Sequence, residues 1–540
     1  MSPTTVTLSA PASVSAPSAG RRTERLGWSA VGGITAVVAS TWVPLLGAPF
    51  GDNHLGRIVG RYALHERNLQ EQGILGSQFG ADWAPYASSP YAHHPPLLNL
   101  LTALTGLLPG DAEYRVWLPP YLLALLIIPA GAALLRGFGI RWSATLLAVG
   151  LMVATPFYWV YSPLMFDLGP ILALSAAVVR LRARPDPGRA LVAGTCAAAL
   201  LTTLVSWPGI AFAAALGLWL FLARRIDRTT ILVAAGMLTG LAISLAFVVG
   251  VTGAGLLGGQ AELRSTGGDY TVPQFLGRQW HFAYLLLPVW YLGALPLGAT
   301  AGLLDRRTRG YLAMAIGFTA AWVLGLSNGA YVHSYWSYPV LVVGLVGMGV
   351  LLDRIVERLV DGPVEPTPAP ATAPPTALAT ATALAPGPEA ARRGSRPLSR
   401  IVGRRSAGLV TVVLIWAALG TYLGAGLVAG SVRHRLLTEP TQAGRLVAEH
   451  PPAAGQRYAW VAGTSVTTPR WFAYYWRLAP RMLTAETLRT DPTARPDDLV
   501  LMNLRQRPDW LPASIEARAV ARDGPYALFP VATLRAAVRD

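Results

Sequence analysis

The sequence predicts an all-α polytopic membrane protein that ends in a small α/β domain. Hydrophobic residues make up 53% of the 540 residues, charged residues only 13%, and the mean hydropathy is +0.42. Soluble domains carry roughly 25% charged residues, so a chain this apolar belongs in lipid. A globular mixture of residues returns only after residue 431, where helix-like and strand-like patterns follow one another.

Apolar runs of about 20 residues, the length that spans the hydrocarbon core of a bilayer, recur along the chain. The first ten form a predicted membrane core over 29–352, with a long first loop over 49–113, and the eleventh follows a linker. These runs predict about eleven transmembrane helices, near 29–48, 114–136, 142–159, 168–182, 189–206, 208–223, 230–252, 282–304, 310–327, 332–352 and 408–430.

The formal net charge of +16 indicates topology rather than nucleic-acid binding. All basic residues are arginines, and they gather in every second connection between the predicted spans, as positive residues do in cytoplasmic loops. No basic run interleaves with aromatic residues in a soluble module, which argues against nucleic-acid binding. We therefore expect a multi-pass protein of the cell membrane, with a disordered N-terminus (1–28) and a linker (353–407) in the cytoplasm. The clusters lie around Arg21, Arg136, Arg182, Arg225, Arg307 and Arg354.

The same alternation places the first loop, the Tyr161–Asp167 turn and the region 431–540 outside, together with all eight histidines. The Pro/Ala/Thr-rich segment Gly362–Pro397 cannot bury a core, which indicates a disordered linker. Beyond the last span, RYAWVAG, DDLVLMN and Tyr526–Pro530 predict strands, and TQAGRLVAEH predicts a helix. An extracytoplasmic α/β domain of about 100 residues fits this pattern.

Two aspartates on the expected outer side are candidate catalytic residues. Asp52 follows the first span, beside Asn53 and His54, and an amphipathic run with helical spacing follows it. A carboxylate there suits a general base or a metal ligand, although capping of the next helix explains it equally well. Asp167 stands in YWVYSPLMFDLGP, where a carboxylate at membrane depth is costly and usually functional; a helix cap is again the alternative.

Histidines, arginines and aromatic residues on this side are candidates for binding a phosphate or a sugar. His93 and His94 precede Pro95 and Pro96 at the start of an apolar run too short to cross a bilayer, which predicts a surface or re-entrant helix. In NGAYVHSYWSYP, His333 and Tyr335 suit phosphate binding or stacking on a sugar, and an interfacial aromatic belt is the alternative. The full candidate set is His54, His93, His94, Arg115, His333 and Tyr335.

One glycine-rich stretch matches a nucleotide-binding motif but lacks the structural context that the motif needs. Gly253, Gly255 and Gly258 match G-x-G-x-x-G, but they follow a membrane span rather than a strand and open no βαβ unit. We therefore expect no nucleotide cofactor. The spacing of cysteine and histidine offers no closed zinc site either.

The order of these features resembles the GT-C glycosyltransferases, and among them the protein O-mannosyltransferases and bacterial aminoarabinose transferases. The resemblance covers roughly residues 29–350 and includes an aromatic turn, HSYWSYP, near the last core helix. Its other parts are the acidic motif GDNHLG after the first span, the long outer loop, the entry YAHHPPL, Glu113 and Arg115 before the next span, and the aspartate of SPLMFD.

The resemblance implies a GT-C-like fold and an inverting transfer of a sugar from a polyprenyl-phosphate donor on the outer face. The acceptor would be a glycan, lipid or protein of the cell envelope. Asp52 would take the catalytic carboxylate position, Asp167 the second acidic position and His94 the position before the paired prolines. The family's acidic pair is usually Asp-Glu, whereas Asn53 follows Asp52 here, so the register of Asp52 stays open. Whether Asp52 and Asp167 hold a divalent metal, Mg²⁺ or Mn²⁺, stays open as well.

Two other classes remain as alternatives. A transporter or lipid flippase should show repeated halves or paired broken helices with intramembrane charges, of which the sequence has little. A non-catalytic scaffold of envelope assembly would make the C-terminal region the main functional part. The sugar, the acceptor, the linkage and the oligomeric state are not readable from the sequence.

Overall fold

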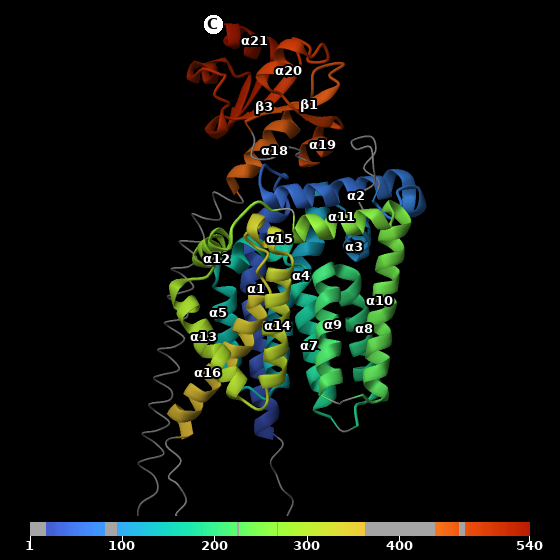
Figure 1. Cartoon of the computed structure of the whole chain (residues 1–540), viewed down its shortest axis with the longest axis vertical. Coiled ribbons are helices and arrows are strands. Elements are labelled where there is room, and N and C mark those ends of the chain that lie inside the picture. Colours follow the sequence, from blue (N-terminus) through green and yellow to red (C-terminus); the bar gives the residue numbers. More distant parts are fainter. Residues whose placement is uncertain are drawn as a thin grey trace, which may run out of the picture.

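The computed structural model describes residues 18–81, 94–184, 186–223, 226–266, 268–361, 438–463 and 470–539. These residues form a bundle of long helices, a layer of shorter helices across one end of it, and a small α/β domain above that layer (Figure 1). The predicted linker from residue 362 onward, the predicted span 408–430 and His93 lie outside the described residues, as does the chain before residue 18. Residues 18–28 and 353–361, expected in the disordered N-terminus and in the linker, are helical instead.

The bundle helices coincide with the first ten predicted spans, and their ends correct three of them. The span predicted over 142–159 is broken at Thr155, whose side chain caps the next helix, with a bend of 61°. The helix predicted from 282 begins at Val289, after a bend of 102°, and the one predicted from 332 begins at Val340. The bundle consists of α1 (Ser18–Leu46), α4 (Ala112–Gly137), α5 (Trp142–Val153), α6 (Pro156–Tyr161), η1 (Ser162–Leu164), α7 (Leu168–Arg182), α8 (Arg189–Val205), α9 (Trp207–Leu222), α10 (Arg228–Thr252), α13 (Val289–Leu304), α14 (Arg309–Gly325) and α16 (Val340–Asp361).

Three described helices are long and apolar enough to cross a membrane alone, and up to five spans result if each of two bent helix pairs counts as one. The remaining bundle helices are shorter or interrupted, so the predicted number of eleven spans is not established. Helices α2 (His54–Gly76), α3 (Leu97–Thr105), α11 (Ala254–Ser265), α12 (Val272–Leu286) and α15 (Ser327–Val332) lie at the end of the bundle nearest the α/β domain (Figure 1). The amphipathic run after Asp52 and the short helix after Pro96 are therefore both confirmed as helices.

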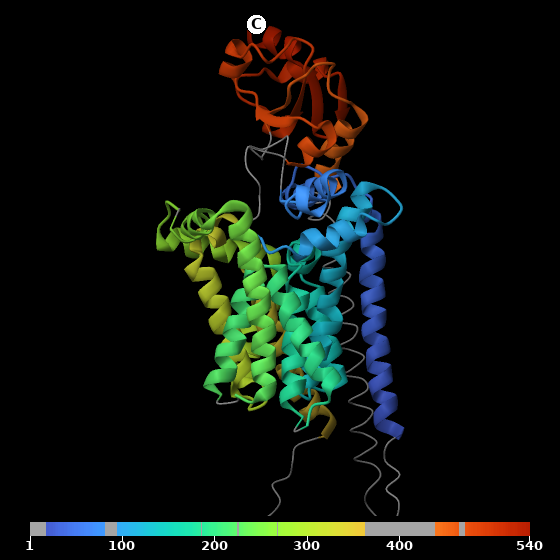
Figure 2. The same ribbon diagram turned by 90° about the vertical axis from the view of Figure 1, so that its right-hand side faces the viewer.

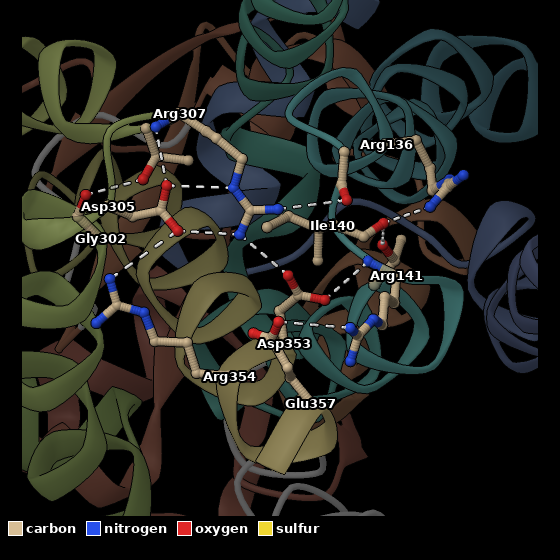
Figure 3. Close-up of polar contacts among 12 residues, drawn as sticks. Arg136, Ile140, Arg141, Gly302, Asp305, Arg307, Asp353, Arg354 and Glu357 are labelled. Atoms are coloured by element: carbon tan, nitrogen blue, oxygen red, sulfur yellow. Dashed lines mark hydrogen bonds and ion pairs between the residues drawn. The ribbon is translucent and has the colours of Figure 1, made fainter. Parts of the chain in front are cut away.

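At the opposite end of the bundle, three arginine-bearing connections meet in one network of ion pairs (Figure 3). One Arg307 nitrogen lies 2.9 Å from Asp305 and 3.0 Å from Asp353 of α16. The other Asp353 oxygen accepts the backbone N–H of Arg141, between α4 and α5, at 3.0 Å. Three arginine clusters therefore lie on one side of the bundle, which the positive-inside alternation requires.

The α/β domain is built on a five-stranded sheet with the order β2-β1-β3-β5-β4. Strands β2, β1 and β3 are parallel, and β5 runs antiparallel to both β3 and β4. The three predicted strands are confirmed, whereas the short edge strands β2 and β4 were missed. Its elements are α18 (Glu439–Glu449), β1 (Tyr458–Ala462), α19 (Arg470–Trp476), β2 (Ala479–Met482), α20 (Ala485–Thr490), β3 (Leu499–Asn503), η3 (Leu504–Gln506), η4 (Ala513–Arg518), β4 (Ala521–Asp523), β5 (Tyr526–Pro530) and α21 (Val531–Arg539).

The α/β domain is docked tightly on the surface helix α2, which Figure 2 shows beneath α18 and α19. A Cβ added at Gly60 would approach Trp471 of α19 to 2.7 Å, so only glycine permits this contact. The Phe50 backbone N–H donates to the Tyr475 hydroxyl at 2.9 Å, and that hydroxyl donates to Glu113 at 2.8 Å. Phe50 and Trp471 are fully buried, so the two parts share one apolar core.

Candidate active site

A cavity of about 690 Å³ lies at the end of the bundle that faces the α/β domain. The helices α2, α10, α11, α14 and α15 contribute residues to its walls. The remaining wall consists of His94, the junction of η1 and α7, the start of α9 and the turn before α16. Residues from across the membrane core therefore converge here because every second connection returns the chain to this end.

Asp167 is the only acidic residue among the described residues that line this cavity. Its Oδ2 accepts hydrogen bonds from the Ser206 hydroxyl at 2.6 Å and the Tyr338 hydroxyl at 2.7 Å. Its Oδ1 is buried and has no hydrogen-bond partner in the described part of the chain. Burial raises the pKa of Asp167 to about 6 against the lowering effect of these hydrogen bonds. A buried carboxylate with one oxygen unsatisfied, in a cavity, is typical of a reactive group.

Nitrogen-bearing side chains surround the space near this carboxylate. Arg61, His94, Arg264 and His333 all line the cavity. Arg264 donates to Nε2 of His333 at 2.7 Å, which fixes the orientation of the two side chains toward each other. His94 is an exposed residue of the cavity wall. Desolvation and the nearby Arg61, Arg264 and His65 lower the pKa of His94 below its ordinary value.

Aromatic rings provide most of the remaining wall. The His333 ring lies 5.8 Å from the Trp336 ring and 5.5 Å from the Tyr335 ring, and Trp336 stacks on Trp322 at 5.4 Å. Aromatic faces suit both the apolar face of a sugar and an isoprenoid chain. His333 and Tyr335 both line the cavity, and their role in binding a phosphate or a sugar stays a prediction. The aromatic side chains that line the cavity are Tyr62, Phe166, Trp207, Trp322, Tyr335, Trp336 and Tyr338.

Asp52 occupies a different place, under the α/β domain rather than among the residues that line this cavity. It is 5% exposed, and its backbone N–H donates to the Pro440 carbonyl at 3.2 Å. Its carboxylate lies beside the Tyr526 side chain of β5. Burial, followed by the Asp52 and Glu439 carboxylates, raises the pKa of Tyr526. The structure therefore does not bring the two predicted carboxylates together in one cavity.

The other predicted site residues are divided between the cavity and its surroundings. His94, His333 and Tyr335 line it, whereas Arg115 lies outside it, 3.6 Å from the buried Glu66. His54 begins α2, and the position of its side chain is not described. His93 lies outside the described residues.

Arg61 and Arg264 are the cavity residues that sequence reasoning missed. Arg61 lies on the amphipathic helix α2, where a single arginine is easily attributed to a solvated face. Arg264 lies near the end of α11, a helix in a loop that we did not expect to be helical. The signal in both cases is an arginine in a connection that the alternation places outside, where arginines are not needed to set the topology.

The predicted divalent metal stays a prediction, because the two carboxylates expected to hold it do not line the same cavity. Within the described ranges, no group of three or more histidine, cysteine, aspartate or glutamate side chains lies close enough to hold a metal ion. Asp167 has no second carboxylate beside it in the cavity. No chemical step is therefore derived through a metal here.

The chain is similar in fold to the aminoarabinose transferase ArnT from Cupriavidus metallidurans in the apo state, with a TM-score of 0.52 and 18% sequence identity. This match covers 95% of the chain and 99% of ArnT. The structure of ArnT bound to undecaprenyl phosphate matches at a TM-score of 0.49 and 16% identity, over 92% and 98% of the two chains. No protein-family model and no curated protein matches the sequence.

Proposed function

We propose that this protein is a glycosyltransferase that transfers a sugar from a polyprenyl-phosphate donor to an acceptor of the cell envelope. The observation that carries the proposal is Asp167, a buried carboxylate with an unpartnered oxygen in a cavity that also contains two arginines and a wall of aromatic rings. The ArnT-like fold and the motif order of the chain support the same class. We place the cavity and the α/β domain on the outer face of the membrane, because the arginine network lies at the opposite end.

Different parts of the donor would bind in two different environments of the cavity. Arg61 and Arg264 carry the positive charge that a phosphate requires, and His94, neutral at physiological pH, contributes hydrogen bonds rather than charge. The aromatic rings around Trp336 offer surface to the sugar and to the first isoprene units. A lipid-linked donor enters from the bilayer, so no soluble nucleotide pocket is needed.

The reaction would be a single displacement with inversion at the anomeric carbon. An acceptor hydroxyl loses its proton to Asp167 as its oxygen bonds to that carbon, and the bond from the carbon to the phosphate oxygen breaks. The electron pair remains on the departing polyprenyl phosphate, where Arg61 and Arg264 stabilise the added charge. With a pKa of about 6, Asp167 is mostly ionised at neutral pH and is well matched to accept a proton. The family resemblance assigns the catalytic position to Asp52, and that role also remains a prediction.

The test is consumption of polyprenyl-phosphate sugars by the purified full chain in detergent, with mannose, arabinose and aminoarabinose donors and envelope glycan as acceptor. Wild-type protein should release polyprenyl phosphate, and Asp167→Asn should lower the rate at least about a hundredfold, the usual contribution of a general base. Parallel reactions with EDTA, Mg²⁺ and Mn²⁺ measure the metal requirement. Folded wild-type protein that consumes none of these donors would refute the proposal. Unchanged turnover in Asp167→Asn would place the chemistry elsewhere.

A further inference from the structure

A second cavity, of about 390 Å³, lies within the α/β domain and differs in chemistry from the first. Residues of α18, η3 and η4 line it together with Arg522 of β4 and the turn between β4 and β5. Its polar lining consists of Glu439, Gln442, Arg505, Glu516 and Arg522. We refer to it as the polar cleft.

The charges of the polar cleft are balanced. Arg505 pairs with Glu439, and Arg522 lies 3.5 Å from Glu516, so two arginines face two glutamates. A cleft for a phosphate or a polyanion would carry an excess of positive charge. Alternating carboxylate and guanidinium groups instead present acceptors and donors side by side, which matches the neighbouring hydroxyls of a neutral saccharide.

Gln442 adds an acceptor that the fold leaves unused. Its Oε1 is buried and has no hydrogen-bond partner within the described residues. It lies against the turn between β4 and β5, where Gly524 has a φ of +56° and an added Cβ would come within 2.2 Å of this oxygen. Gly524 is needed in this turn for its backbone conformation, and its lack of a Cβ leaves the space beside the cleft that the Gln442 side chain occupies. An unsatisfied acceptor beside a polar cleft is a group that a bound hydroxyl would satisfy once the Gln442 side chain turns from Gly524 toward the cleft.

The position of the polar cleft connects it to the predicted chemistry. It lies beyond the carboxyl end of β3, at the edge of an α/β sheet where such folds bind ligands. Pro525 lines it, and the side chain of the next residue, Tyr526, lies beside the Asp52 carboxylate. Glu439 lines it as well, and Pro440 accepts the hydrogen bond from the Asp52 backbone. The cleft is therefore next to the acidic motif of the first loop.

We propose that the polar cleft binds the acceptor, and that the acceptor is a neutral, hydroxyl-rich saccharide. This inference rests on the proposed function, because it assigns the second substrate of the same transfer. It gives the α/β domain the task of holding the glycan beside the first loop, while the membrane core holds the lipid-linked donor.

The test measures saccharide binding directly, without turnover. Neutral oligosaccharides of mannose, arabinose and glucose are offered to the full chain in nanodiscs, and binding is followed by saturation-transfer NMR. We expect Gln442→Ala and Arg522→Ala to weaken binding of the preferred saccharide at least about fivefold each, the equivalent of about 1 kcal/mol per hydrogen bond. Arg489→Ala is the matched control, since Arg489 is an exposed arginine of the same domain on α20 and does not line the cleft.

The outcomes separate this inference from the proposed function. Loss of saccharide binding in the two cleft variants, with wild-type melting and wild-type binding of polyprenyl phosphate, supports the cleft whether or not transfer is observed. Equal binding by wild type, Gln442→Ala and Arg522→Ala overturns it even if the protein proves to be a glycosyltransferase. Absence of binding of every saccharide by folded wild-type protein at millimolar concentration also overturns it.

Discussion

The two aspartates that the sequence singles out have different surroundings. Asp167 lies in a cavity built by the membrane core, where two hydroxyls donate to one of its oxygens and the other oxygen has no described partner. Asp52 lies under the α/β domain, where its carboxylate is beside Tyr526 and its backbone N–H donates to Pro440, and both residues are far away in sequence. The membrane core by itself therefore determines the environment of Asp167, whereas two parts of the chain determine that of Asp52.

The largest expected effect separates these two carboxylates. Asp167→Asn should lower sugar transfer at least about a hundredfold because it removes the base from the cavity. The resemblance predicts a loss of similar size for Asp52→Asn, and Tyr526→Phe, which removes only the partner of Asp52, should cost less than about tenfold. Steady-state transfer by well-folded variants checks this. If Asp52→Asn and Tyr526→Phe have the same small effect, Asp52 holds the domains together and is not catalytic.

The next effect compares an arginine in the cavity with one outside it. Arg264→Ala should raise the donor concentration needed for half-maximal rate about ten- to a hundredfold, because a charge-assisted hydrogen bond to phosphate is worth about 1.5 to 3 kcal/mol. Arg115→Ala should change the donor concentration needed for half-maximal rate less than about threefold, because Arg115 faces Glu66 instead of the cavity. Acceptor dependence serves as the control in both variants. A donor-specific effect of Arg115→Ala as large as that of Arg264→Ala would restore the sequence prediction for Arg115.

The pH dependence of transfer should reflect Asp167 rather than an exposed carboxylate. Burial raises its pKa to about 6, and the base must be ionised to accept a proton. The rate at low donor and acceptor concentration should therefore fall as the pH decreases through about 6, by roughly tenfold per unit below that value. An acidic limb near pH 4 would instead indicate a carboxylate of ordinary pKa.

The smallest expected effect concerns the contact between the domains. Tyr475→Phe removes the acceptor of the Phe50 N–H and the donor to Glu113, leaving both groups unsatisfied. Local opening should become easier by about 1 to 3 kcal/mol. Hydrogen exchange should therefore accelerate at residues 48–52 and 470–476, while Tyr458→Phe on β1 leaves it unchanged. Equal exchange in both variants would show that packing of Phe50 and Trp471 alone holds the domain.

The sequence was informative wherever a local pattern sets the structure. Apolar runs predict the bundle helices, and the alternation of arginines brings Asp167 and His333 to the same end, where one cavity contains both. The partners of Asp52 leave no such pattern, because Tyr526 and Pro440 contact it across hundreds of residues. Arg61 and Arg264 were missed for a related reason, since an arginine on a surface helix has the same sequence pattern whether it faces water or a cavity.

The hydrogen bond between Phe50 and Tyr475 joins residues 425 positions apart, and this separation sets an order of assembly. The ribosome completes the first loop early, yet the face of α2 around Gly60 has no cover until Trp471 has been synthesised and its domain has folded. Contacts of such long range form late because the loop between them must close first. A chain released before residue 470 would present Phe50 and the bare face of α2 to solvent, so an incomplete protein has an exposed apolar surface that the finished one lacks.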